Sequence, residues 1–316
     1  MSETPAHTEL PAENTSVLPA EPAPGNEDVI DGETHALEWH APVLVRIDEH
    51  TTIPHLLAKR VQRAPRRPLI ARKLEMGSTW QNMTAAEFYE EVQTTAAGLI
   101  GLGLNYGDAI AIMSRTRYEW TLLDFAAWTA GLLPVPIYET SSGEQIEYII
   151  KDADVRAIVT ETVTQRELAL DACHRLGKDD ITVLSLDAEA MQTIRDAGIT
   201  VPRASVAART QALTTDTLAT IVYTSGTTGR PKGTEITHGN FTELALNSHA
   251  WMPEIAMGQD SRLLLFLPLA HVFARFLQVF QLSGEGILGH TPDIKNLLSD
   301  LATFKPSYLL VVPRVL

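Results

Sequence analysis

One short segment, from Tyr223 to Gly233, combines residue types suited to holding phosphate groups. It reads Tyr-Thr-Ser-Gly-Thr-Thr-Gly-Arg-Pro-Lys-Gly. Its glycines permit positive φ and close backbone approach, so successive N–H groups can converge on phosphate oxygens. The hydroxyls add donors or a ligand for Mg²⁺, and Lys232 adds a mobile positive charge. The segment therefore predicts a phosphate loop from Thr224 to Gly233 that holds a polyphosphate.

Two other interpretations of this segment explain less. A flexible surface turn would account for the glycines and hydroxyls, but not for Lys232 or the direct entry from the apolar run 219–223. A Walker A loop needs Gly, four residues, then Gly-Lys-Ser/Thr at the start of a helix. Here that spacing fails, Pro231 precedes the lysine, and residues 234–237 look extended. We therefore expect the loop to lead into extended chain rather than into a helix.

Two motifs carry a resemblance to a known family. The run TSGTTGRPKG resembles the phosphate-loop signature of the adenylate-forming superfamily, which includes acyl-CoA synthetases, luciferases and peptide-synthetase adenylation domains. The run LPLAHVFAR, residues 267–275, resembles the aromatic-gate motif in its long-chain fatty-acid CoA ligase form. Further similar stretches extend from about Trp39 through 118–120, 136–140 and 237–241 to 312–314. Only the acidic N-terminal tail lies outside the resemblance.

The resemblance implies a fold, a reaction and a set of site residues. The fold is the layered αβαβα N-terminal domain of these enzymes. The reaction converts a fatty acid and ATP into acyl-adenylate and pyrophosphate, after which the thiol of CoA displaces AMP, with Mg²⁺ as the metal. The residues implied to hold the β- and γ-phosphates are Thr224, Ser225, Gly226, Thr227, Thr228 and Gly229. Thr224 is also implied as the Mg²⁺ ligand, and Lys232 as the group that neutralises the departing pyrophosphate.

The second motif implies a place for His271 beside the acyl carboxylate. A histidine in an apolar run is ordinarily a hydrogen-bonded core residue, but the matched flanking residues favour the site. Arg275 and Arg314 are expected to form ordinary surface pairs, and neither is given a role.

Several parts of the family pattern are absent up to Leu316. These are the acidic Mg²⁺ residue, the ribose-binding aspartate, the hinge and the small C-terminal lid domain with its lysine. The apolar end at 314–316 is typical of a cut inside a domain, so we expect an N-terminal fragment. Two alternatives stay open: a truncated, non-catalytic module that binds nucleotide or acyl groups, and an acyl-AMP ligase that loads a carrier protein. Acyl chain length and oligomeric state also stay open.

Alternating helical and strand-like stretches from about Ile53 predict the layered α/β fold. Capping boxes predict helices after Thr84 (with Glu87) and after Ser142 (with Gln145), and Asn240 with Glu243 is read as a third helix start. A helix is also expected from about Trp120 to Gly131. The expected strands are 109–113, an edge-like 133–137, 157–160, 181–186, 219–223, 262–266 and 308–312. Residues 188–214 have no firm period.

Composition divides the chain and excludes some functions. The formal charge is −14, and no Lys or Arg precedes Arg46. We expect a disordered acidic tail over 1–40, a first α/β subdomain over 41–215 and the start of a second over 216–316. The acidic balance disfavours nucleic-acid binding. A lone Cys173, no signal peptide and no bilayer-length apolar run predict a cytoplasmic protein, with peripheral membrane contact left open.

Overall fold

The computed structural model describes residues 42–73, 79–224, 231–258 and 260–311. The helices are α1 (Ile53–Arg63), α2 (Ala85–Gly101), α3 (Tyr118–Thr129), α4 (Gly143–Asp152), α5 (Val163–Arg175), α6 (Ala190–Ala197), α7 (Arg203–Gln211), α8 (His238–Trp251), α9 (Pro253–Ala256), α10 (Val272–Ser283) and α11 (Leu297–Phe304), with a 3₁₀ helix at Ile294–Asn296. The strands are β1 (Pro68–Lys73), β2 (Trp80–Thr84), β3 (Ala109–Met113), β4 (Leu133–Ile137), β5 (Val155–Thr160), β6 (Thr182–Ser185), β7 (Leu218–Thr224), β8 (Lys232–Thr237), β9 (Arg262–Leu265) and β10 (Ile287–His290).

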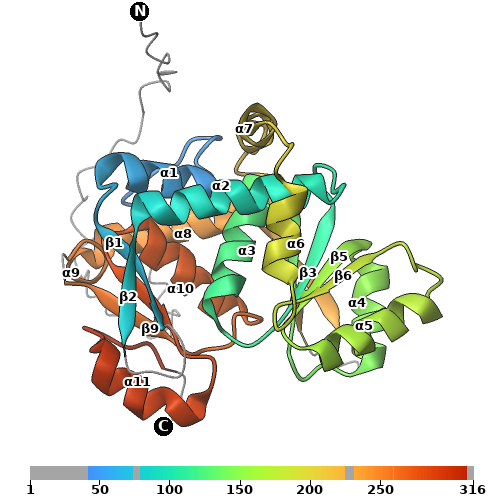
Figure 1. Ribbon diagram of the computed structural model, residues 1–316. Helices are drawn as coiled ribbons and strands as arrows, with labels where there is room; N and C mark the ends of the chain where they lie inside the picture. The colour runs from blue at the N-terminus through green and yellow to red at the C-terminus, as the bar shows by residue number, and fades with distance from the viewer. Residues whose placement is uncertain (1–41, 74–78, 225–230, 259, 312–316) are drawn as a thin grey trace, which may run out of the picture.

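These strands form two four-stranded sheets and one hairpin. The first sheet has the order β2-β1-β10-β9, and only β2 runs antiparallel to its neighbour. The second, β4-β3-β5-β6, is wholly parallel, and β7 and β8 pair as an antiparallel ribbon. Figure 1 shows the two sheets on opposite sides of α3. The predicted α/β class, with mainly parallel sheets covered by helices, is confirmed.

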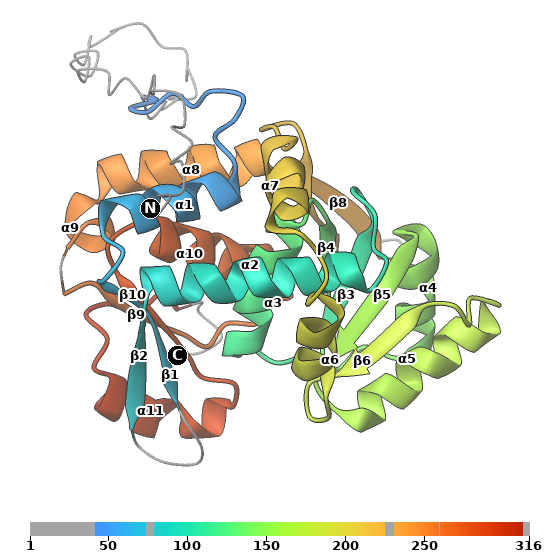
Figure 2. The ribbon, with the colours of Figure 1, turned by 45° about the horizontal axis from the view of Figure 1, so that its top comes forward.

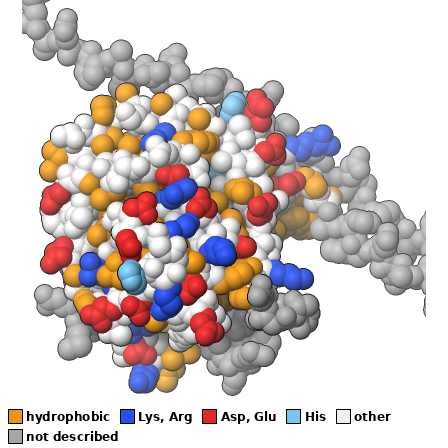
Figure 3. Space-filling view, turned by 90° about the vertical axis from the view of Figure 1, so that its right-hand side faces the viewer, with side chains coloured by type: hydrophobic (Ala, Val, Ile, Leu, Met, Phe, Trp, Pro, Cys, Tyr) orange, Lys and Arg blue, Asp and Glu red, His pale blue; other side chains and the backbone are white. Residues whose placement is uncertain are grey.

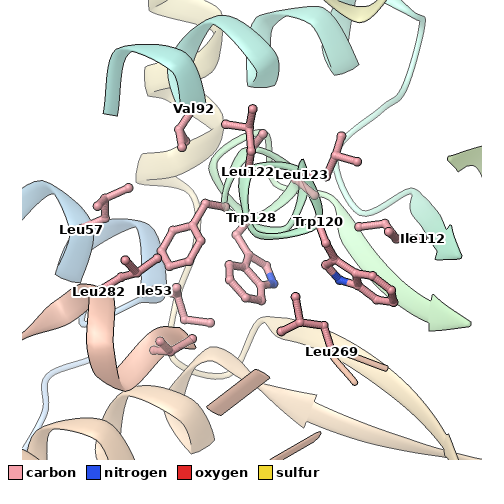
Figure 4. Packing of buried hydrophobic residues seen from close by; sticks show 14 of the residues in the cluster. Ile53, Leu57, Val92, Ile112, Trp120, Leu122, Leu123, Trp128, Leu269 and Leu282 are labelled. Atoms are coloured by element: carbon pink, nitrogen blue, oxygen red, sulfur yellow. The ribbon is translucent and has the colours of Figure 1, made fainter. Parts of the chain in front are cut away.

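Helix α3 is the centre of the core. Every residue of this helix except Glu119 is buried, which explains why its sequence is apolar on almost all sides. Figure 4 shows α3 nearly end-on, with Leu122 directed towards Val92 of α2 and Trp120 directed towards Leu269. A single hydrophobic cluster therefore links α3 to segments from both halves of the chain.

Several predicted elements are confirmed. Strand β3 has the expected bounds, and β4, which contains two prolines, is the edge strand of its sheet. The capping boxes at Thr84 and Ser142 are both formed, with their side chains accepting the N–H groups of Glu87 and Gln145. These signals are local, so sequence alone suffices to locate them.

The helix start assigned to Asn240 is wrong by three residues. The N-cap of α8 is Thr237, whose hydroxyl accepts the Asn240 N–H at 3.2 Å. The Asn240 side-chain oxygen in turn accepts the Thr237 N–H at 3.0 Å. Asn240 thus fills the third helical position of the box, where an amide can take the place of the usual Glu or Gln.

The strand expected at 308–312 is also wrong over its described residues. Tyr308 makes one isolated parallel bridge to Leu263, and residues 309–311 have no regular structure. An apolar run becomes a strand only where a neighbour continues its ladder, and here just one residue finds a partner. Residue 312 lies outside the described residues.

The unassigned stretch 188–214 holds two short helices, α6 and α7. Helix α6 packs closely on α2: a Cβ added to Gly98 would lie 2.1 Å from the Ile194 carbonyl oxygen. The acidic tail expected to be disordered lies outside the described residues. Subdomains were expected over 41–215 and 216–316, but the first sheet pairs β1 with β10 and so contains residues from both ranges. The division at position 215 stays a prediction. In the part of the chain that the structure describes, no helix combines the length and hydropathy required to cross a bilayer.

Candidate active site

The two ends of the predicted phosphate loop meet in the β7–β8 ribbon. Thr224 pairs directly with Lys232, and Tyr223 pairs with Gly233. The loop between them contains Ser225, Gly226, Thr227, Thr228 and Gly229, which lie outside the described residues. The chain continues after the loop as strand β8, so the expectation that the loop leads into extended chain is confirmed.

Strand β7 of this ribbon is held by three hydrogen bonds to the rest of the molecule. The Tyr223 hydroxyl donates to Asp152 Oδ2 of α4 at 2.6 Å, and the Thr220 hydroxyl donates to the Pro134 carbonyl at 2.8 Å. The Trp128 indole N–H donates to the Ala219 carbonyl at 2.7 Å. Burial, with the neighbouring Asp152 carboxylate, raises the pKa of Tyr223, so its hydroxyl stays a donor. The ribbon lies at the β4 end of the second sheet, where β7 packs beside β4 (Figure 2).

The two side chains that flank the loop are free to meet a ligand. Thr224 and Lys232 are both exposed, and within the described residues neither side chain forms a hydrogen bond or ion pair. Gly233 sits where a Cβ would approach Ile221 Cγ2 to 2.8 Å, so a larger residue would disturb the ribbon beside Lys232. A hydroxyl and an ammonium group thus stand opposite each other across the mouth of the loop.

His271 is the N-cap of α10 and is exposed rather than buried in the core. Its Nδ1 accepts the Phe273 backbone N–H at 3.2 Å. Because Nδ1 acts as an acceptor, the hydrogen of the neutral ring resides on Nε2. Nε2 has no partner among the described residues, so the ring presents a donor at the start of the helix. Within the described residues, no hydrogen bond or ion pair joins His271 to Thr224 or Lys232.

Thr116 fixes the segment that precedes His271. Its hydroxyl donates to the Leu267 carbonyl at 2.7 Å and accepts the Leu269 N–H at 3.1 Å. Leu267 and Leu269 are buried in the main cluster. The residues of the second motif are therefore held against the loop that leads into α3.

Arg275, expected in an ordinary surface pair, is instead fully buried. Its Nη2 donates to Asp124 Oδ1 at 2.9 Å, and neither side chain is exposed. The expectation failed because α10 packs inside the molecule, which places the end of its first turn against α3. Arg314 lies outside the described residues.

A cavity of about 620 Å³ opens where strands of both sheets end. Lys73 ends β1, His290 ends β10, and Arg115 and Glu161 closely follow β3 and β5. The remaining wall comes from the start of α3 and from α11. Crevices at the carboxyl ends of parallel strands are the usual ligand sites of open α/β folds. Sequence reasoning missed this cavity, although charged residues directly after several strands were a usable signal.

Most charged groups of the cavity form ion pairs, whereas Arg72 lies over the Tyr118 ring. Arg115 Nε and its backbone N–H donate to Glu161 at 2.9 and 2.8 Å, and Lys73 pairs with Asp300. Burial alone would raise the pKa of Glu161, but the hydrogen bonds from Arg115 bring it below its usual value. Burial lowers the pKa of His290 to about 4, so that ring is neutral near pH 7. The cavity wall is thus polar but nearly balanced in charge.

The oxygen-bearing side chains of the described residues suit Mg²⁺ only in part. Mg²⁺ prefers oxygen ligands and keeps several waters or phosphate oxygens. The exposed Thr224 hydroxyl fits such a role at the mouth of the loop. Over residues 42–311, apart from the gaps stated above, no three His, Cys, Asp or Glu side chains form a potential metal cluster. Protein carboxylates for a metal are therefore not gathered in this part of the chain.

Comparison with known proteins identifies relatives over most of the chain. The family model described as AMP-binding enzyme matches residues 57–316. The long-chain-fatty-acid–CoA ligase FadD15 of Mycobacterium bovis is 35% identical over 280 residues, covering 88% of this chain and 46% of its own length. The ligase ACSBG2 of Rattus norvegicus is 29% identical over 297 residues, covering 86% and 44%. The chain thus spans about half the length of these relatives.

Solved structures agree on the fold. The crystal structure of VinN superposes with a TM-score of 0.69 at 19% identity, covering 85% of this chain and 63% of that one. A fatty acyl CoA synthetase of Mycobacterium tuberculosis gives a TM-score of 0.66 at 22% identity, covering 85% and 51%. With the family match extending over most of the sequence, from the first helix through both motifs, this chain belongs to the AMP-binding enzyme family.

Proposed function

We propose that the complete gene product activates a long-chain fatty acid with ATP, forming acyl-adenylate, and then transfers the acyl group to CoA. The observation that carries the proposal is the pairing of Thr224 with Lys232 across the ends of the glycine- and hydroxyl-rich loop. This arrangement suits a triphosphate, because a carboxylate that attacks a polyanion requires positive charge and preorganised donors nearby. Membership of the AMP-binding enzyme family supports the same reaction class.

Each flanking residue has a distinct proposed role. Residues 224–229 bind the β- and γ-phosphates, and Lys232 neutralises charge on the departing pyrophosphate. His271, with its donor on Nε2, orients the acyl carboxylate near the α-phosphorus. Mg²⁺ would be held by Thr224 together with phosphate oxygens, and when bound it would offset further negative charge.

The choice of fatty acid and CoA rests on the relatives. FadD15 and ACSBG2 are both named as long-chain-fatty-acid–CoA ligases, and the motif at 267–275 resembles the long-chain form. We also propose a cytoplasmic site of action, which a single buried, unpaired Cys173 suits. Supplying CoA or a carrier protein as acceptor tests the last step: acyl transfer only to the carrier would contradict the CoA assignment.

The Lys232→Ala variant tests the phosphate loop. Loss of one transition-state donor lowers rates by about a hundredfold or more, so we expect fatty-acid-dependent exchange of pyrophosphate into ATP to fall by about that factor. The fold should persist, because Lys232 is exposed. Lys178→Ala, which removes a half-buried lysine paired with Asp154, is the control and should keep the wild-type rate. Wild-type exchange by Lys232→Ala would refute the role of this lysine.

A further inference from the structure

A buried ion pair and a glutamine connect α3 to α10. Asp124 of α3 and Arg275 of α10 are both fully buried. One carboxylate oxygen accepts Arg275 Nη2 at 2.9 Å, and the other accepts Gln278 Nε2 at 2.6 Å. The proposed chemistry at the phosphate loop uses none of these three groups.

Stability alone is a weak explanation for this pair. Two buried charges usually hold a fold no better than a well-packed apolar pair of similar size, because both must be removed from water. Here Arg275 is only partly satisfied, since its Nε and Nη1 have no hydrogen-bond partner within the described residues. Its guanidinium carbon lies 5.5 Å from the centre of the Trp128 ring. The hydrogen bonds of Asp124 instead fix how the side chains of α10 are oriented relative to α3, which an apolar contact does not do.

In the hydrogen bonds beyond the ion pair, the charge of Asp124 determines which group donates and which accepts. A carboxylate only accepts, so Gln278 must turn its NH₂ group towards Asp124, which leaves its oxygen to accept from the Thr121 hydroxyl at 2.9 Å. The Thr121 oxygen is then left to accept from His290 Nε2 at 2.7 Å. One charge thereby orders a buried network that joins α3, α10 and the end of β10.

This network binds α10 at Arg275 and Gln278, shortly after His271. The backbone N–H of Arg275 donates to the His271 carbonyl at 3.3 Å, so the residue held by Asp124 closes the first turn of the helix. Gln278 repeats the attachment one turn later. On the other side of His271, Thr116 holds Leu267 and Leu269. His271 therefore lies between two attachments that both originate from α3 and the residues leading into it.

We propose that Asp124 is a positioning residue, which fixes the first two turns of α10 and thereby sets the direction of the His271 imidazole. The inference rests on the proposed function in that His271 is assigned to the acyl carboxylate. The positioning itself is a property of the fold and can be measured separately.

The test introduces Asp124→Leu and Arg275→Met together into the complete gene product, once with His271 intact and once with His271→Ala. Each double replacement is compared with the protein that lacks it. The apolar pair should keep the thermal midpoint within a few degrees. We expect kcat for fatty-acid-dependent pyrophosphate exchange to fall by at least about tenfold with the KM for ATP unchanged, since small misplacements near reacting groups can cost about a hundredfold. In a His271→Ala background the same pair should cause no further loss. Equal losses in both backgrounds, or no loss in either, would overturn the proposal.

Two further measurements keep the test decisive. Ser283→Ala removes a hydroxyl that bonds the Val279 carbonyl in the last turn of α10, and it should leave kcat unchanged. Asp124→Asn, assayed identically, replaces the double variant if the latter does not fold.

A readout without catalysis separates this inference from the proposed function. Nitrogen chemical shifts of His271 should report hydrogen on Nε2 in wild type and a mixture of tautomers in the double variant. Identical shifts would exclude positioning by Asp124. Absence of exchange in wild type would instead refute the proposed function alone.

Discussion

His271 and Arg275 lie four residues apart in one helix, yet they have opposite environments. His271 caps the helix and is exposed, whereas Arg275 is wholly buried against Asp124. Their residue types alone indicate the reverse, since histidines in apolar runs are often buried and arginines rarely are. What separates them is the contact between α10 and α3. The role of a single residue therefore depends on packing as well as on motif.

The His271→Ala variant should separate the two half-reactions. Loss of the Nε2 donor should slow exchange with fatty acid more than it slows thioester formation from pre-made acyl-adenylate, because the carboxylate is already activated in the second case. The two rates can be measured on one preparation, with His174→Ala, an exposed histidine of α5, as the control. Equal losses in both half-reactions would rule out a role beside the carboxylate.

At the scale of elements, helix caps are the most readable part of this sequence. The box at Ser142 is formed by hydrogen bonds within four residues: Ser142 Oγ accepts the Gln145 N–H at 3.3 Å, and the Gln145 side chain accepts the Ser142 N–H at 2.9 Å. Such bonds need no distant partner. The same locality explains why β3 and the extended chain after the loop were predicted correctly.

Replacement of this cap gives a quantitative check. Ser142→Ala removes the acceptor for one N–H of the first turn of α4 and should destabilise the protein by about 1 kcal/mol. Ser141→Ala is a matched control, because the neighbouring hydroxyl makes no cap contact. Urea unfolding of the two variants should differ by that amount. Indistinguishable midpoints would show that the box contributes nothing measurable.

Elements that depend on distant partners were not predictable. Helix α6 is only eight residues long and is stabilised by close packing on Gly98 of α2, a contact that no local period reveals. Residues 309–311 have strand-like composition but no continuous ladder. The same contrast between local and distant determinants applies to the candidate site. The motifs located Lys232 and His271, whereas the cavity and the Asp124 network join segments more than 150 residues apart.

At the scale of the whole molecule, two sheets converge on one polar cavity while the outer surface mixes charges. Figure 3 shows acidic and basic side chains interspersed on the face that contains α4 and α5. Pairs such as Arg175 with Glu147 and Lys178 with Asp154 account for this pattern. The face therefore has no concentrated basic region of the kind that phosphate backbones of nucleic acids require.

Acid sensitivity is a property of the whole fold, because its buried histidines are held neutral. Burial lowers the pKa of His238 from 6.5 to about 3 and that of His290 to about 4. Between these values and 6.5 the unfolded chain binds more protons than the folded one, so stability is complete above pH 6.5 and falls as the pH drops. Glu161, whose folded pKa is lowered by Arg115, adds its own loss only below the usual pKa of glutamate.

His290 alone should account for about 2 kcal/mol of the stability lost between pH 7 and pH 5. Replacing it with Gln keeps a donor near the position of Nε2 for Thr121 but removes the titrating ring. Urea unfolding at both pH values should therefore show a smaller drop for His290→Gln than for wild type. His174→Gln, at an exposed position, should leave the drop unchanged. An undiminished drop in His290→Gln would mean that His290 accepts a proton on Nδ1 in the folded state, which would leave the hydrogen bond from Nε2 to Thr121 in place.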